Sequence, residues 1–216
     1  MDAVSQSPAV GRFVGIVPDL LTAAFCAALW VSPFMFGVDA VKGVILAMIL
    51  EFILIHATAF LMSIAFATDR TRAGRIVSSL SLTAFYLLLV ASFSALFRSW
   101  WPIVVFLWLS VSKIAWVLSD PREREAERSR QSDAWMFSVA AYIVTVVAGV
   151  VLPLPALGLT PEAVARLGLP GTGQWIEHPQ AALFSMALYY LASAWYKWNS
   201  DTRGIVNLIR SSRSGG

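Results

Sequence analysis

The sequence predicts an all-α polytopic membrane protein, a six-transmembrane-helix bundle with both termini in the cytoplasm. Hydrophobic residues make up 58% of the 216 positions and charged residues 13%, and the mean hydropathy is +0.70. These values lie outside the range of water-soluble domains of this size. The apolar runs follow one another too closely to leave room for a separate soluble core, so we expect one domain.

Six apolar runs are long enough to cross a bilayer, which takes about 20 residues of α-helix. They cover approximately residues 14–36, 42–67, 75–97, 100–119, 133–153 and 179–198. The polar segment 1–13 precedes the first run, which is too long for the core of a signal peptide, so we expect it to stay as an anchor. The transmembrane domain then extends over residues 14–200, and residues 201–216 form a basic tail.

The distribution of Lys and Arg predicts the orientation of these spans, because such residues are enriched in short cytoplasmic connections. Residues on the side predicted to be cytoplasmic are Arg70, Arg72, Arg75, Arg122, Arg124, Arg128, Arg130, Lys197, Arg203, Arg210 and Arg213. The opposite connections hold only Lys42, Arg98 and Arg166. We therefore expect a multi-pass protein of the cell membrane, a bacterial inner membrane. The net charge of +3 reflects this topology, and we expect no nucleic-acid partner.

Two connections contain helix signals. In the outer loop 154–178, Thr160 can cap a short helix that begins at Pro161 and ends at Gly168. In the cytoplasmic connection between the fourth and fifth runs, Asp120 can cap a solvated helix with Pro121 at its first position.

No motif indicates a reaction. The HExxH, GxSxG, P-loop and GxGxxG patterns do not occur, which disfavours an enzyme, and we expect no catalytic residue, metal site or cofactor. Haem ligation by two histidines is excluded because His56 lies about 20 Å below the outer surface whereas His178 lies at it; a single axial ligand stays open. Asp19 should lie near the cytoplasmic end of the first span, within reach of water or headgroups.

Glu51 and His56 interrupt the second apolar run. Ionisable residues within a span are rare, and they usually face the protein interior and pair with another polar group. Five residues of α-helix correspond to about 500° of rotation, roughly 140° net, so the two side chains address different neighbours. The second helix should therefore be central, with protein on more than one side.

Depth along the spans indicates partners for these two residues. Tyr189 and Tyr190 reach the level of Glu51 and can donate hydrogen bonds to it. Lys113 lies close to the level of His56, although it can also extend its ammonium group to the cytoplasmic interface. The candidate ion or proton site therefore comprises Glu51, His56, Tyr189, Tyr190 and Lys113. The alternative is structural: a protonated Glu51 and a neutral His56 that tie helices together.

Two functions of different classes follow. The first is a channel or transporter that moves protons or cations at Glu51 and His56, as a homo-oligomer because six helices with few polar residues line a pore poorly. The second is a non-catalytic membrane subunit that packs in a larger complex. In both, membrane lipids surround the chain. An enzyme acting on lipid, with the same pair as acid and base, is disfavoured because groups 140° apart do not reach one substrate.

Overall fold

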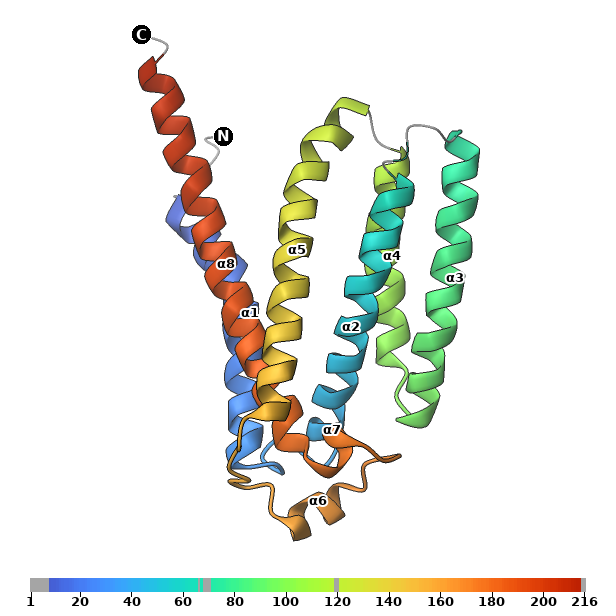
Figure 1. Ribbon diagram of the computed structural model, residues 1–216, viewed down its shortest axis with the longest axis vertical. Helices are drawn as coiled ribbons and strands as arrows, with labels where there is room; N and C mark the ends of the chain where they lie inside the picture. The colour runs from blue at the N-terminus through green and yellow to red at the C-terminus, as the bar shows by residue number, and fades with distance from the viewer. Residues whose placement is uncertain (1–7, 66, 68–70, 119–120, 215–216) are drawn as a thin grey trace, which may run out of the picture.

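The computed structural model describes residues 8–65, 67, 71–118 and 121–214, with side chains over 13–64, 67, 71–110 and 131–200. Within these residues the fold is all-α (Figure 1). The helices are α1 (Pro8–Val31), α2 (Ala40–Ala65), α3 (Arg72–Leu96), α4 (Trp101–Leu118), α5 (Pro121–Val151), α6 (Pro161–Leu167), α7 (Gln174–Glu177) and α8 (Pro179–Ser214). Each of the six expected runs corresponds to one long helix. The two short helices lie in the connection between α5 and α8.

Four of the long helices contain segments that are long and apolar enough to cross a membrane. These segments are Phe13–Val31, Ala40–Ile64, Arg72–Leu96 and Gln131–Val151. The described part of α4 adds a shorter apolar stretch, Trp101–Ser110. The chain is therefore a helical multi-pass membrane protein with four candidate spans; six spans and cytoplasmic termini stay predictions.

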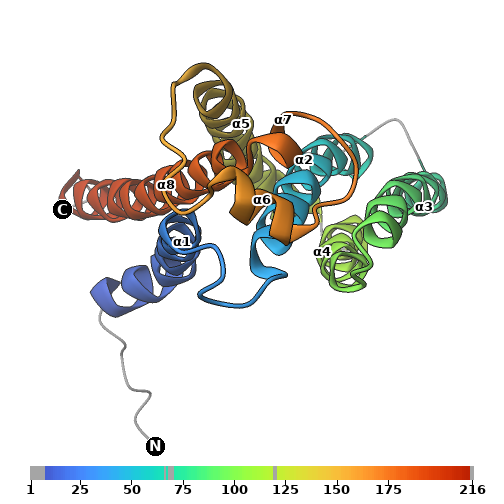
Figure 2. The ribbon, with the colours of Figure 1, turned by 90° about the horizontal axis from the view of Figure 1, so that it is seen from below.

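Helix α2 occupies the centre of the bundle, as the sequence predicts. It contacts α1, α3, α4, α5 and α8. In the view along the bundle, α2 lies between an α1–α8 pair and an α3–α4 pair (Figure 2). The helices α1 and α8 lean away from α2 toward the end at which α1 begins and α8 ends (Figures 1 and 2).

The core surrounds α2 on both sides. One cluster joins α2 to α1, α5, α8 and the α5–α8 connection, and its most buried members include Leu29, Ile45, Met48, Leu167, Leu183 and Met186. The second cluster joins α2 to α3 and α4 through Leu50, Ile53, Ala57, Tyr86, Val90 and Phe106. Burial of these side chains on two opposite faces of α2 explains why this helix is apolar around most of its circumference.

Helices α5 and α8 approach closely at Gly149. A Cβ atom there would lie 2.2 Å from Ser185 Oγ and 2.8 Å from the carbonyl oxygen of Ala181. The single hydroxyl hydrogen of Ser185 is shared within this contact between the carbonyl oxygens of Thr145 and Ala181, which lie 3.0 and 2.7 Å from Oγ. Small residues permit such backbone approach between membrane helices.

The predicted loop helix α6 is confirmed, including both of its ends. Thr160 Oγ1 accepts a hydrogen bond from the backbone N–H of Ala163 at 3.3 Å. Gly168 ends the helix in the left-handed conformation, with φ of 54°, which glycine adopts without strain. On the other side of the bundle, the helix predicted to begin at Pro121 does begin there, but it continues through the fifth span to Val151. Asp120, its predicted cap, lies outside the described residues.

The α5–α8 connection is fastened to the end of α1. The Trp30 indole N–H donates to the carbonyl oxygen of Pro155 at 2.9 Å, and the N–H of Gly158 donates to the carbonyl oxygen of Trp30 at 3.1 Å. Leu159, which follows directly, is buried in the core. These contacts position α6 across the end of the bundle (Figure 1).

Candidate functional site

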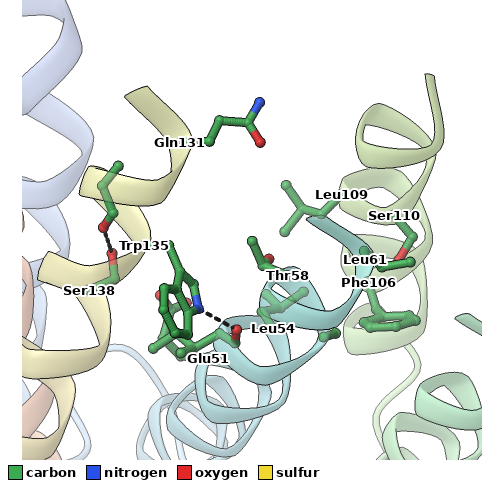
Figure 3. A pocket seen from close by; sticks show the side chains of 13 residues that line it. Glu51, Leu54, Thr58, Leu61, Phe106, Leu109, Ser110, Gln131, Trp135 and Ser138 are labelled. Carbon is green, nitrogen blue, oxygen red and sulfur yellow. Dashed lines mark hydrogen bonds between the residues drawn. The ribbon is translucent and has the colours of Figure 1, made fainter. Parts of the chain in front are cut away.

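A cavity of about 280 Å³ lies between α2, α4 and α5 (Figure 3). Glu51 lies at one end of it and Gln131 at the other, with α5 and α4 on opposite sides and α2 between them. Its polar lining residues are Glu51, Thr58, Ser110, Gln131 and Ser138, and the remaining lining is apolar. The cavity therefore presents one carboxyl group and four neutral polar side chains within a bundle of apolar helices.

Glu51 is held by a tyrosine from α8. The Tyr189 hydroxyl donates a hydrogen bond to Glu51 Oε1 at 2.5 Å, and Tyr189 is buried. The ring of Tyr189 contacts the rings of Tyr142 and Tyr190, with centroids 5.8 and 5.3 Å away. The Tyr142 hydroxyl donates to the carbonyl oxygen of Met48 at 2.9 Å. These three residues, the tyrosine cluster, join α2, α5 and α8 at the level of Glu51.

Trp135 fixes the wall that α5 contributes. Its indole N–H donates to the carbonyl oxygen of Ile55 at 2.9 Å, which ties α5 to α2 (Figure 3). Ser138 lies one turn away and donates to the carbonyl oxygen of Ala134 at 2.9 Å, so its hydroxyl oxygen stays on this face of the helix. Residues 131, 134, 135 and 138 recur at the spacing of one helical stripe, and Gln131, Trp135 and Ser138 supply its polar groups.

His56 lies elsewhere. It is exposed, on a face of α2 that the lining of the Glu51 cavity does not include. Its Nδ1 lies 2.8 Å from the carbonyl oxygen of Phe52, and since a carbonyl oxygen only accepts, we assign the proton to Nδ1. The imidazole ring also contacts the Phe52 ring, with centroids 4.1 Å apart. Contrary to the expectation that both ionisable groups face the interior, only Glu51 does so.

The structure thus brings together two of the five predicted site residues, Glu51 and Tyr189. Tyr190 is adjacent through its ring contact with Tyr189. His56 is separate. The side chain of Lys113 lies outside the described residues.

An ion pair between α1 and α8 was not predicted from the sequence. Lys197 Nζ of α8 lies 2.7 Å from Asp19 Oδ2 of α1, and the Asp19 side chain is 10% exposed whereas that of Lys197 is 49% exposed. The sequence predicts that water or headgroups reach Asp19, and this is wrong because α8 packs along α1 and covers the aspartate. The cytoplasmic position of Lys197 stays a prediction.

Comparisons with protein families, with characterised proteins and with solved structures give no match.

Proposed function

We propose that this protein is a transporter that moves protons across the membrane, with Glu51 as the group that takes up and releases the proton. The observation that carries the proposal is the position of Glu51 at the end of a partly polar cavity, in a hydrogen bond with Tyr189. Carboxyl groups inside spans are costly and are typical of proton and ion pathways. The cavity volume of about 280 Å³ is at the lower limit of the roughly 300–1,000 Å³ of pockets for organic ligands.

In the same proposal the chain has six spans, α1 to α5 and α8, and both termini are cytoplasmic. The basis is the excess of Lys and Arg at the end of the bundle where α1 begins. The Gln131 end of the cavity, near the start of the fifth apolar segment, then faces the cytoplasm. Glu51 would exchange protons with that side.

Packing beyond Glu51 favours a transporter over an open channel. Met48 and Ile45, about one and two turns further along α2, are fully buried, and Met186 of α8 packs against them. A proton that reaches Glu51 from the Gln131 end therefore meets close-packed apolar side chains on the other side. Release to that side requires a rearrangement of helices, as in alternating access.

The Tyr189 bond offers a physical link between protonation and such a rearrangement. A carboxylate only accepts hydrogen bonds, whereas a carboxylic acid also donates one. Protonation of Glu51 therefore changes the bond that joins α2 to α8, and through Tyr142 it changes the surroundings of α5 as well. The charge on Glu51 would then bias how these three helices pack.

The test is proton flux in proteoliposomes that contain a pH-sensitive dye, driven by an imposed potassium diffusion potential. Wild-type protein should carry flux above that of empty vesicles, and Glu51→Gln should abolish it while the protein stays folded. Glu162→Gln, the same change in the exposed connection, is the matched control and should carry normal flux. Flux of wild-type size in Glu51→Gln, or none in the wild type, would rule the proposal out.

One observation favours the second candidate, a non-catalytic subunit that packs in a larger membrane complex. His56, Phe60 and Ser63 of α2 are all exposed along one face, and an imidazole in contact with acyl chains is unfavourable. A second protein chain over this face would shield it. If so, His56→Leu should reduce the molecular mass of the complex purified in mild detergent, whereas Phe85→Ala, on an exposed apolar position of α3, should not. An unchanged mass in His56→Leu argues against a partner on this face.

A further inference from the structure

Two adjoining cavities lie at the end of the bundle that carries α6 and α7. The first, the polar cavity, has a volume of about 730 Å³ and is lined by Asp39, Lys42, Arg98 and Ser99 together with apolar residues. The second, the apolar cavity, has a volume of about 600 Å³ and lies between α2, α3 and the segment 170–176. Both cavities are lined by Leu96, Phe97 and Pro170. They are therefore neighbours separated by these shared side chains.

The polar cavity carries an excess of positive charge. Lys42 Nζ lies 3.1 Å from Asp39 Oδ1, so this carboxylate neutralises one of the two cations that line the cavity. Arg98 is exposed and lines the cavity, and the ion pairs among the described residues, Lys42 with Asp39 and Lys197 with Asp19, do not include its guanidinium. Its backbone has a φ of 52°, a conformation that is uncommon for residues other than glycine and that is often retained where function requires it. An anionic group of charge −1 would neutralise the remaining positive charge of the cavity.

The apolar cavity has the shape and lining of a crevice for a hydrocarbon chain. On α2 it extends from Ile45 to Ile53, about 12 Å along the helix axis at 1.5 Å per residue, and therefore along the direction in which acyl chains lie. Leu89 and Phe93 of α3 form its other wall. Trp175 lines it as well, and its buried indole N–H has no acceptor among the described residues.

We propose that an anionic phospholipid of the surrounding leaflet binds across the two cavities. Its phosphodiester lies between Lys42 and Arg98, and one acyl chain lies in the apolar cavity. Lys and Arg side chains at the membrane interface bind lipid phosphate through charge-assisted hydrogen bonds. A zwitterionic phosphatidylcholine fits less well, because its quaternary ammonium restores the positive charge that the phosphate would neutralise.

Native mass spectrometry of the full chain in detergent tests this proposal. The ligands are phosphatidylglycerol, phosphatidylcholine with the same acyl chains, and glycerol 3-phosphate, which has the phosphate without the chains. We expect phosphatidylglycerol to bind more tightly than both others. Arg98→Gln should weaken it about tenfold, the equivalent of one charge-assisted hydrogen bond. Leu89→Trp should weaken it by filling the apolar cavity without any change of charge.

Two controls make the result specific. Arg166→Gln removes a positive charge at the same end of the bundle, where Arg166 lies over the Phe34 ring at 4.5 Å, and should leave binding unchanged. Glu51→Gln should also bind phosphatidylglycerol normally, so that a failure of the proton proposal does not affect this one. Equal affinity for the two lipids with no effect of Arg98→Gln would overturn the proposal. So would glycerol 3-phosphate binding as tightly as phosphatidylglycerol, which would indicate a site for soluble phosphate.

Discussion

The hydroxyl of Tyr189 and the carboxyl group of Glu51, 138 positions apart in the chain, form a 2.5 Å hydrogen bond between α8 and α2. Each partner satisfies a polar atom of the other in a region where acyl chains and apolar side chains offer no substitute. The bond therefore stabilises the packing of α8 against α2, and a change in the protonation of Glu51 would alter the contact between these two helices.

Tyr189→Phe should destabilise the fold by about 1–2 kcal/mol, because it removes the donor and leaves a carboxyl oxygen unpaired. The measurement is the free energy of unfolding in mixed micelles with increasing denaturing detergent. Tyr190→Phe is the matched control, since Tyr190 contacts its neighbour through the ring and should lose much less. Equal losses in the two variants would show that the bond adds no stability.

The pair formed by Asp19 and Lys197 should have a measurable coupling energy. Half of the lysine side chain is exposed, so we expect about 1 kcal/mol, nearer to the value of a surface pair than to that of a buried one. The test is a double-mutant cycle with Asp19→Asn, Lys197→Gln and the double variant. Lys197→Gln should be the more harmful single change, because it leaves a covered carboxylate without its cation; strictly additive effects would contradict the pairing.

Gly149→Ala should be destabilising although alanine is the better helix former. Its Cβ would lie 2.2 Å from Ser185 Oγ and 2.8 Å from a backbone oxygen of α8, so α5 and α8 must separate, at a cost of about 1–3 kcal/mol. Gly15→Ala in α1 is the control, since a Cβ there meets nothing within 4 Å and alanine should be neutral or stabilising by about 0.5–1 kcal/mol. Thermal unfolding in detergent distinguishes the two. A Gly149→Ala protein as stable as the wild type would refute the close contact.

The stability of α6 should depend on pH through Glu162. Hydrogen bonds, first from its own backbone N–H and then from the Thr160 side chain, hold the pKa of this carboxyl below its ordinary value of 4.5. A lowered pKa in the folded state means that the carboxylate stabilises the helix above pH 4.5. This contribution is lost as the pH falls through the lower folded-state pKa.

Carboxyl NMR of selectively labelled protein measures this pKa directly, and amide exchange within α6 should become faster in the same acidic range. Thr160→Ala removes one of the two causes and should move the pKa upward, toward 4.5. Glu177 belongs to the same connection and provides a reference signal in the same spectra. A Glu162 pKa at or above 4.5 in the wild type would contradict the capping interaction.

Local signals in the sequence were sufficient for the elements of the fold. The runs of apolar residues predicted all six long helices, and Thr160 with Gly168 predicted both ends of α6, because capping and turn formation depend on adjacent residues. The positions of the residues along the predicted spans also placed Tyr189 at the level of Glu51. The rotation about α8 that aims its hydroxyl at the carboxyl could not be read from spacing alone.

The features that could not be predicted from the sequence depend on how helices far apart in the chain pack together. The 140° between Glu51 and His56 indicated different neighbours, but not that His56 would be exposed on the surface of α2. That outcome depends on where α3 and α5 lie, and no local pattern encodes it. In the same way the contact of Asp19 with Lys197 depends on the register between α1 and α8 over many turns. The cavity exists because α4 and α5 stand apart at this level.

The two hydrogen bonds of Trp30 and Gly158 restrict where the molecule can bend. They clamp the end of α1 to the chain that links α5 with α8, so three of the long helices are anchored together at one end of the molecule. A hinge between the α1–α8 pair and the rest would therefore lie close to these two bonds. Rotation about such a hinge would displace the helices least at the bonds and most at the opposite end of the bundle, toward which Gln131 lies.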